Sequence, residues 1–205
     1  MIKTYGGGKW IYGSKEVSFE DAELIVMPGG SDWGTEYYNH DPIPGVPRHN
    51  SDLNQRQYDL AKRAIVEGKF VWGNCKGLQL VTILAGGWLI QDVNHPSYHE
   101  MVLNNGKTYR VNSLHHQMCY PYDLPDNHYE VIGWSRQLST YHTIQGNKQL
   151  SFNKKTLDED GLFKEPELIW YPAIKSFGGQ FHAEWMDRNA TLDLVNDIIR
   201  EKMNK

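Results

Sequence analysis

Short apolar runs alternate with amphipathic stretches along the first half of the chain. Residues 24–27 form a continuous apolar run that ends in a Pro-Gly-Gly turn, which predicts a buried strand. Residues 51–67 predict a helix, because apolar positions recur on one face and Gly68 provides a stop. A second buried strand is predicted at residues 70–72, and a second helix at 78–84. Strands and helices that alternate at this spacing favour a layered α/β sheet.

The second half of the chain is richer in β-like runs. Residues 88–152 contain several short ones, and residues 153–167 are polar enough to predict an exposed excursion. Residues 168–171 and 176–181 predict a closing hairpin, and a last helix is predicted from about Asn189. Since no repeat or linker-like stretch divides the sequence, we expect all 205 residues to form a single domain.

Composition and charge exclude several classes of protein. Hydrophobic residues make up 40% and charged residues 22% of the chain, which excludes a disordered or low-complexity protein. The formal charge of −4, without a dense Lys/Arg run, argues against nucleic acid as a partner. No apolar run approaches the roughly 20 residues of a membrane span. The start of the chain lacks an apolar leader. We therefore expect no membrane association and a cytoplasmic location.

One of the two cysteines stands in an unusual context. Cys75 lies between Gly73 and Gly77, at the point where a predicted strand passes into a predicted helix. This arrangement predicts a nucleophile elbow, in which a sharp turn exposes the central side chain. The helix N-terminus is expected to lower the pKa of the thiol, and its free N–H groups can hold an oxyanion. Gln79 lies one helical turn later and is expected to reach a bound substrate. The alternative is a small buried residue in an ordinary turn.

A second motif lies near the end of the chain, in the segment Gly178 to Glu184. In an extended chain, residues two apart point to the same side, so Glu184 can orient His182. His182 can in turn deprotonate Cys75, which gives a nucleophile, a base and an orienting group. The alternative for the His-x-Glu pair alone is an ordinary surface pair.

Together these motifs resemble those of the class I (triad) glutamine amidotransferases. Residues 27–32 are similar to the glycine loop that follows an early strand in that family. Residues 86–92 and 111–117 are most similar to the γ-glutamyl hydrolase branch, peptidase family C26. The resemblance runs in the correct order from residue 24 to residue 186.

The resemblance implies a fold and a chemistry. The fold would be a three-layer, doubly wound α/β structure of the flavodoxin-like kind, with a mostly parallel sheet and a β-rich later segment. The reaction would be hydrolysis of a γ-glutamyl amide through a thioester. In that reaction Cys75 would be the nucleophile, His182 the base and Glu184 its partner.

The resemblance also implies residues that bind the substrate. The main-chain N–H groups of Gly30 and Lys76 would form the oxyanion hole. Gln79, Ser113 and His115 would lie around the α-amino and α-carboxylate groups of the glutamyl substrate.

Other clusters of polar or aromatic residues are less informative. The pairs His95/His99 and His115/His116 invite a metal site, but Pro96 interrupts the first pair and no further ligands complete a zinc set, so we expect neither metal nor cofactor. Two hypotheses stay open for the aromatic loop at residues 33–48, a surface that faces substrate and a loop packed by its own aromatics. Cys119 is expected to be structural, and Gly6–Gly8 with Trp10 stand where the family usually has a first βα unit.

Three functions remain open at this level. The first is a glutaminase-type subunit that delivers ammonia to a separate synthetase or ligase chain. The second is a stand-alone γ-glutamyl hydrolase or peptidase, for which water is the only acceptor. The third is an idle binding module on the same fold, against which the complete set of three reacting residues argues. In the first two functions the small-molecule partner is glutamine or another γ-glutamyl compound, and a homo-oligomer is left open.

Overall fold

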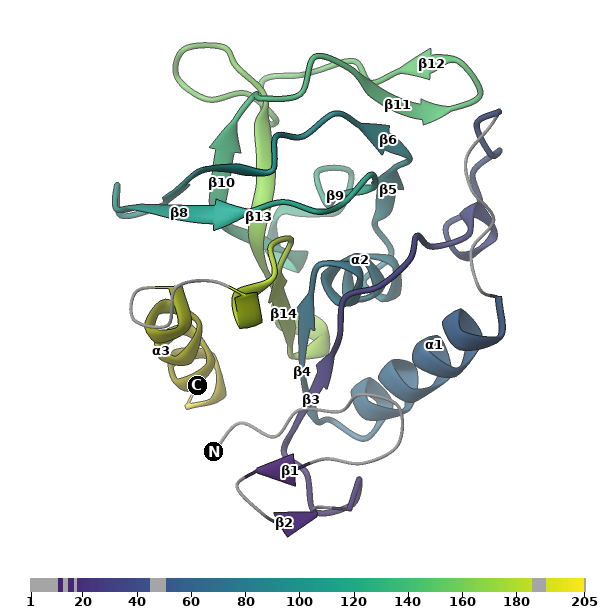
Figure 1. Ribbon diagram of the computed structural model, residues 1–205, viewed down its shortest axis with the longest axis vertical. Helices are drawn as coiled ribbons and strands as arrows, with labels where there is room; N and C mark the ends of the chain where they lie inside the picture. Colours follow the sequence, from purple (N-terminus) through teal and green to yellow (C-terminus); the bar gives the residue numbers. More distant parts are fainter. Residues whose placement is uncertain (1–10, 13–14, 17, 45–50, 186–190, 205) are drawn as a thin grey trace.

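A computed structural model describes residues 11–12, 15–16, 18–44, 51–185 and 191–204 (Figure 1). A seven-stranded sheet runs through its centre. In order across the sheet, its strands are β3 (Leu24–Met27), β4 (Phe70–Asn74), β14 (Ser176–Gly179), β13 (Lys164–Tyr171), β10 (Glu130–Arg136), β7 (Tyr98–Leu103) and β8 (Thr108–Asn112).

The sheet has a parallel part and an antiparallel part. The strands β3, β4 and β14 pair in parallel, whereas β14, β13, β10, β7 and β8 pair antiparallel. The parallel part holds the two buried strands predicted first in the sequence, and the antiparallel part is the expected β-rich later segment. The closing hairpin predicted around residues 168–181 is the pair β13–β14.

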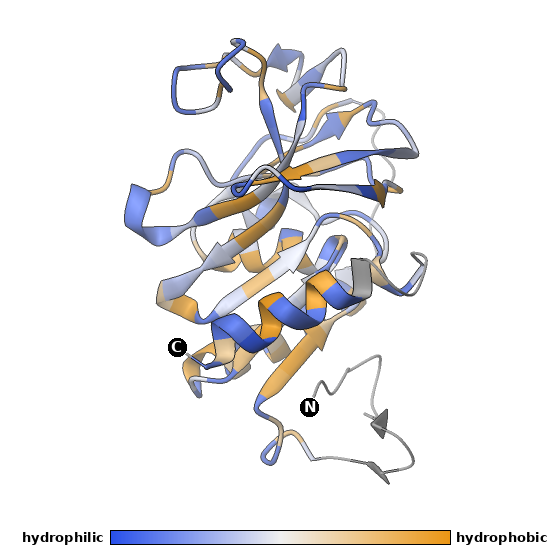
Figure 2. Cartoon of the chain, turned by 90° about the vertical axis from the view of Figure 1, so that its left-hand side faces the viewer, coloured by the Kyte–Doolittle hydropathy of each residue, from blue (hydrophilic) through white to orange (hydrophobic). Residues whose placement is uncertain are grey.

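Helices cover both faces of the sheet, which makes three layers. The helices α1 (Ser51–Val66) and α2 (Lys76–Leu84) pack on one face, around apolar residues such as Ile25, Val71 and Leu80. The helix α3 (Thr191–Met203) covers the other face through Leu194, Val195 and Ile198. Figure 2, seen from the side of α3, shows the apolar strands behind this helix. The expected α/β class is confirmed.

Smaller β-elements cap the sheet at the end where the parallel strands finish. They are the three-stranded sheet β6 (Asp92–Val93), β11 (His142–Gln145) and β12 (Lys148–Gln149), and the pair β5 (Trp88–Ile90) and β9 (Met118–Tyr120). A third apolar cluster, which includes Ile90, Met118 and Phe163, joins them to the sheet. A hairpin of β1 (Ile11–Tyr12) and β2 (Lys15–Glu16) is separate from the main sheet.

The polar segment at residues 153–167 is not exposed throughout. Its first part is mostly exposed, but β13 begins at Lys164, and both Glu165 and Glu167 are fully buried within that strand. The expectation of an exposed excursion is therefore wrong for its last residues. The prediction assumed that polar residues are exposed, whereas these two carboxylates are buried together with histidine partners, described below.

Two expectations concern the ends of the chain. Gly6–Gly8 and Trp10 lie outside the described residues, and so does the start predicted for the last helix at Asn189. Among the helices of the described residues, none combines the length and the apolar character needed to cross a membrane.

Candidate active site

A strained turn between β4 and α2 carries Cys75. This residue has φ 49° and ψ −106°, a positive-φ conformation that is rare for a residue with a side chain. Gly73 and Gly77 lack side chains at points where two main-chain segments approach each other closely. A Cβ on Gly73 would overlap the backbone of Gly77, and a Cβ on Gly77 would overlap the carbonyl of Met27. The sharp strand–turn–helix predicted around Cys75 is therefore present.

Burial decides the protonation of the Cys75 thiol. Only 2% of the residue is exposed. Burial raises the pKa of the thiol to about 12, and the main-chain N–H of Lys76 lowers it only in part. The helix N-terminus lowers this pKa as expected, but the loss of hydration outweighs that contribution, and the expected net decrease does not occur. In the free protein Cys75 is a neutral thiol at neutral pH and needs a base to become a nucleophile.

His182 follows β14 and is held by three neighbours. The side chain of Asn112 accepts a hydrogen bond from the main-chain N–H of His182 at 2.8 Å and donates one to its carbonyl at 3.1 Å. Nδ1 of His182 lies 2.9 Å from Oε1 of Glu184, and the indole of Trp185 stacks on the imidazole with ring centroids 4.1 Å apart. Partial burial raises the pKa of Glu184, but the hydrogen bond with His182, a main-chain hydrogen bond and the charge of the imidazole together outweigh burial and lower the pKa. An ionised Glu184 is suited to orient the imidazole.

The order of the parallel strands places the segment that carries His182 beside the end of β4. That strand lies between β3 and β14, and its last residue, Asn74, pairs with Gly179 of β14. The main-chain N–H of Cys75 donates to the carbonyl of Gly179 at 2.7 Å. On the other side of β4, Gly29 lies against the imidazole of His182, where a Cβ would overlap the ring. The imidazole of His182, which follows β14, therefore reaches the loop that follows β3.

The loop that follows β3 is fixed against the first turn of α2 by Lys76. Nζ of this buried lysine donates to Oδ1 of Asn54 in α1 at 2.6 Å and lies 4.8 Å from the ring centroid of Trp33. The indole N–H of Trp33 donates to the carbonyl of Lys76 at 2.9 Å. Burial lowers the pKa of Lys76 to about 8. A Cβ on Gly30 would lie 3.2 Å from Cδ of Lys76, so the two predicted oxyanion-hole residues come from adjacent segments.

Gln79 and the segment at residues 113–117 form a connected wall. The side-chain amide of Gln79 donates to the carbonyl of Gln117 at 2.7 Å, and Nδ1 of His115 lies 2.9 Å from the same oxygen. The main-chain N–H of Ser113 donates to the carbonyl of Ser97 at 2.8 Å. The amide of Gln79 thus has a partner within the protein, and Gln79 positions the segment that carries Ser113 and His115.

The aromatic residues of the loop after β3 pack into the protein. Trp33 is 2% and Tyr38 is 7% exposed. Tyr37 contacts both Trp33 and Tyr58 of α1, with ring centroids 5.1 and 5.3 Å apart. The packed loop is therefore the hypothesis that the described residues support, while residues 45–48 lie outside them.

Gln180 contacts residues on three other segments, those of Cys75, Cys119 and Glu167. The sequence motifs did not indicate this role. The main-chain N–H of Gln180 donates to the carbonyl of Glu167 at 2.7 Å, and its Oε1 accepts from both the main-chain N–H and the thiol of Cys119 at 3.3 Å. Its Nε2 lies 3.9 Å from Sγ of Cys75. The available signal was its position two residues before His182, since alternate residues of an extended segment share a side.

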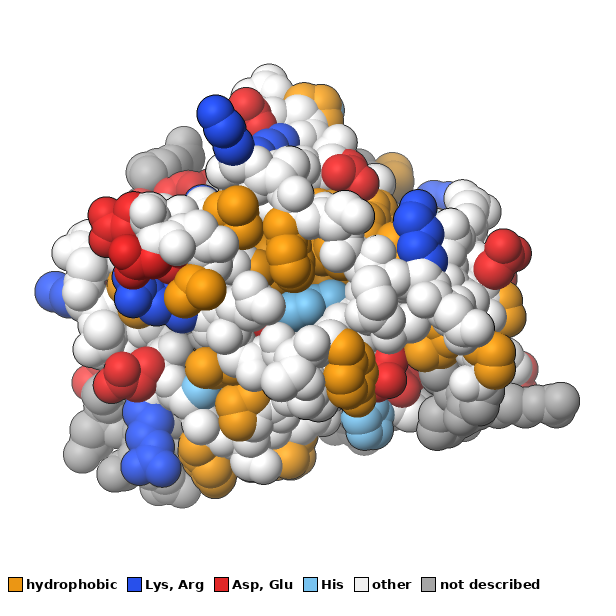
Figure 3. Space-filling model, turned by 90° about the horizontal axis from the view of Figure 1, so that it is seen from above, with side chains coloured by type: hydrophobic (Ala, Val, Ile, Leu, Met, Phe, Trp, Pro, Cys, Tyr) orange, Lys and Arg blue, Asp and Glu red, His pale blue; other side chains and the backbone are white. Residues whose placement is uncertain are grey.

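Two buried glutamates with histidine partners lie beside this wall. Glu165 pairs with His95 through nitrogen–oxygen distances of 2.9 Å and with His142 through 2.8 Å, and Glu167 pairs with His99 at 2.9 Å. Burial raises the pKa of Glu165, but the hydrogen bonds from His142 and His95 outweigh it and hold this pKa well below its usual range. Figure 3 shows histidine atoms near the centre of the face seen from above, among apolar side chains.

Comparisons with solved structures agree with this architecture. A putative subunit of GMP synthase from Thermoplasma acidophilum has a TM-score of 0.54 and 13% identity, over 89% of this chain and 73% of that one. A glutamine amidotransferase from Thermotoga maritima has a TM-score of 0.52 and 16% identity, over 92% of this chain and 66% of that one. At these identities the likeness shows a shared fold.

Sequence comparisons are more specific. Protein NtpR of Enterococcus hirae is 25% identical over 173 residues, which are 80% of this chain and 68% of NtpR. The putative glutamine amidotransferase-like protein YvdE of Lactococcus lactis subsp. lactis is 29% identical over 120 residues, which are 47% of this chain and 50% of YvdE. The model of the Peptidase C26 family matches residues 16–184. This match covers most of the sequence, and the chain belongs to the peptidase C26 family.

Proposed function

We propose that this protein hydrolyses γ-glutamyl amides, with Cys75 as the nucleophile, His182 as the base and Glu184 as its orienting partner. The observation that carries the proposal is the strained conformation of Cys75, φ 49°, at the end of β4, the strand between β3 and the β14 segment that leads to His182. Backbone strain persists where the surrounding structure enforces it, and it is concentrated at active sites. A family match to peptidase C26 supports the same chemistry.

The reaction begins with a proton transfer, because the buried thiol is neutral in the free protein. Nε2 of His182 accepts the proton of Cys75, and Sγ attacks the γ-carbonyl carbon of the substrate. The tetrahedral intermediate collapses with cleavage of the C–N bond, and the imidazolium returns its proton to the departing amine or ammonia. Water, deprotonated by the same imidazole, then attacks the thioester carbonyl, the C–S bond breaks to release glutamate, and the imidazolium returns its proton to the Cys75 thiolate. Glu184 stabilises the imidazolium in both halves of the cycle.

Two main-chain N–H groups would stabilise the oxyanion of each tetrahedral intermediate. Those of Gly30 and Lys76 are suited to this because the side chain of Lys76 lies against the Gly30 loop. The wall at Ser113 and His115, which Gln79 positions, would hold the α-amino and α-carboxylate groups of the glutamyl end.

The acceptor distinguishes two forms of this function. The primary form is a glutaminase-type subunit that passes ammonia to a separate synthetase or ligase chain. It is supported by the likeness to YvdE, a putative glutamine amidotransferase-like protein, and by the fold shared with the putative GMP synthase subunit of Thermoplasma acidophilum. The alternative is a stand-alone γ-glutamyl hydrolase or peptidase, which the Peptidase C26 match favours.

A product assay separates these forms. The purified chain is incubated with glutamine and with a panel of γ-glutamyl amines, alone and with candidate ligases, and glutamate release is measured. Glutamine hydrolysis that requires a ligase supports the subunit form, and efficient cleavage of γ-glutamyl amines by the chain alone supports the hydrolase. Absence of glutamate release under all these conditions contradicts both forms and favours an idle binding module.

A further inference from the structure

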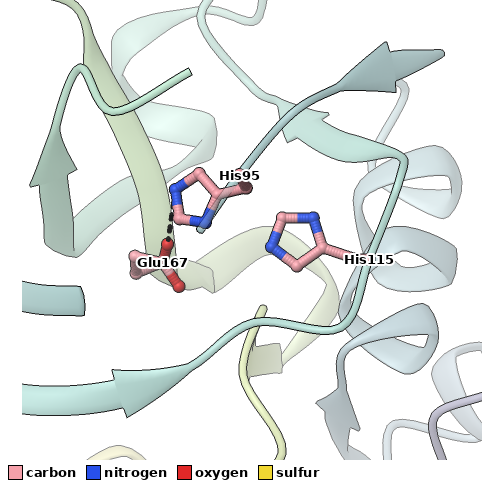
Figure 4. Close-up of side chains that lie close together, drawn as sticks. All are labelled: His95, His115 and Glu167. Atoms are coloured by element: carbon pink, nitrogen blue, oxygen red, sulfur yellow. Dashed lines mark ion pairs between the residues drawn. The ribbon is translucent and has the colours of Figure 1, made fainter. Parts of the chain in front are cut away.

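His95, His115 and Glu167 form a buried cluster beside the wall made by Gln79 and residues 113–117. They come from three different segments: the link between β6 and β7, the segment after β8, and β13. One ligand-type atom from each lies within 4.8 Å of the other two. Figure 4 shows both imidazoles and the carboxylate turned towards one another. The ring centroids of His95 and His115 are 5.2 Å apart.

Each of these side chains has one polar atom engaged and one without a partner. The atoms without a hydrogen-bond partner in the described structure are Nδ1 of His95, Nε2 of His115 and Oε2 of Glu167, and all three are buried. The side chains of His95 and Glu167 are 0% exposed, and His115 is 8% exposed. Buried polar atoms are normally paired, so three unpaired ones in a single cluster indicate a site for a ligand.

The engaged atoms have the partners that support metal ligands. Nε2 of His95 lies 2.9 Å from Oε2 of Glu165, and Nδ1 of His115 lies 2.9 Å from the carbonyl of Gln117. Histidines that bind a metal typically donate their other ring N–H to a carboxylate or a backbone carbonyl, which fixes the ring and its tautomer. The ligating carboxylate is usually hydrogen-bonded as well, and Oε1 of Glu167 lies 2.9 Å from Nε2 of His99.

We infer that His95, His115 and Glu167 bind a divalent transition-metal ion of the zinc type. Two imidazole nitrogens and one carboxylate oxygen suit zinc and its first-row neighbours, whereas calcium and magnesium prefer sites made of oxygen atoms. Two ligands of one ion are at most about 4 Å apart, since each lies about 2 Å from it. The observed limit of 4.8 Å therefore requires only small side-chain shifts. Three protein ligands leave a fourth position for water or a substrate group.

The inferred site adjoins the catalytic centre without sharing its reacting groups. Gln180 contacts both, since its main-chain N–H donates to the carbonyl of Glu167 at 2.7 Å and its side chain lies 3.9 Å from Sγ of Cys75. A bound ion would join the segments that carry His95 and His115 to β13, beside the predicted glutamyl pocket. Because the test below measures metal binding directly, its result does not depend on the proposed hydrolysis.

Cobalt titration of the full chain, free of any histidine tag and cleared of metal by a chelator, tests the inference. We expect one Co²⁺ per chain, with the visible absorption of a four- or five-coordinate ion and no thiolate-to-cobalt charge-transfer band. His95→Gln and Glu167→Gln should each lower the affinity by more than the roughly 10–100-fold typical of losing an outer-shell partner. The matched control is His128→Gln, because His128 is exposed and lies outside the cluster. That variant should bind as the wild type does.

Several outcomes would overturn the inference. They are a wild-type chain that binds no stoichiometric Co²⁺, equal affinity in the ligand variants and the control, or loss of binding in Cys75→Ala, which would move the ion to the thiol. If the ligand variants fail to fold, X-ray absorption of the zinc-loaded wild type decides. Nitrogen and oxygen ligands with two imidazoles support the site, and a sulfur ligand or a fully hydrated ion contradicts it.

Discussion

Cys75, in the turn that ends the parallel part of the sheet, and Glu165, within the antiparallel part, are both buried acids, yet their protonation differs. Burial raises the pKa of both groups. For Cys75 the one opposing contribution, from the main-chain N–H of Lys76, is smaller than the effect of burial, and the pKa rises to about 12. For Glu165, hydrogen bonds from His142 and His95 reverse the effect, and main-chain N–H groups of Leu138 and Ser139 at 3.0 Å add to them.

The difference shows that the partners of a buried group decide its charge. The parallel part keeps its thiol neutral until a base removes the proton, which suits a nucleophile that reacts only with bound substrate. The antiparallel part keeps a carboxylate ionised inside the protein, which suits a fixed network of charges. Substitutions in the first part should therefore change activity, and substitutions in the second should change stability.

The largest expected effect is that of Cys75→Ala, which should reduce turnover to background. Its free energy of unfolding should stay within about 1–2 kcal/mol of the wild type, because one sulfur is removed at a turn that glycines shape. The matched control is Cys119→Ser, which keeps a hydrogen-bond donor towards Gln180. Glutamate release should persist in this control, and equal losses in the two variants would contradict the assignment of the nucleophile.

His182→Asn should lower kcat by the roughly 10²–10⁴-fold typical of losing a general base. Glu184→Gln should cost less, since an amide oxygen can keep part of the hydrogen bond to Nδ1 of His182. Steady-state kinetics with γ-glutamyl anilide measure both losses. If Glu184→Gln lowered kcat as much as His182→Asn does, the proposal that Glu184 only orients His182 would be contradicted.

Glu165→Gln should destabilise the fold by about 3–5 kcal/mol, because it leaves the partners of a buried carboxylate without their acceptor charge. The matched control is Glu159→Gln on the exposed segment, where the same chemical change should have an effect within about 0.5 kcal/mol. Urea unfolding measures both. A Glu165→Gln protein as stable as the control would show that the histidine–glutamate network contributes nothing to stability.

The smallest expected effect is that of Gln79→Ala. Gln79 lies in α2, and its side chain contacts the segment that follows β8. The substitution removes the donor to the carbonyl of Gln117 and leaves that buried oxygen to His115 alone. A cost of about 1–2 kcal/mol corresponds to a fall of about 10-fold in kcat/KM. Because the change acts on the binding wall, kcat should fall less than kcat/KM, and the opposite order would contradict the positioning role.

Local patterns in the sequence were enough to predict the parallel part of the fold. The helix predicted at residues 51–67 is observed as α1, and the turn at Cys75 is strained as the flanking glycines indicated. The cluster of His95, His115 and Glu167 could not be predicted in this way. Its members are far apart in the chain, and only the antiparallel register of the sheet brings them together.

The protonation of Cys75 shows a second limit of local reasoning. A helix N-terminus can be read from the sequence, and it favours the thiolate. Burial to 2% exposure depends on packing by residues from other elements, and it has the larger effect on the pKa.

Trapping of the acyl-enzyme tests the central claim, that Cys75 forms a γ-glutamyl thioester, most directly. The wild-type chain is mixed with a slowly hydrolysed γ-glutamyl ester, quenched in acid and digested, and the peptides are analysed by mass spectrometry. We predict one added glutamyl group on the peptide that contains Cys75, none on the peptide that contains Cys119, and no adduct in Cys75→Ala. Substrate turnover without any adduct at Cys75, or an adduct at Cys119, would contradict the account.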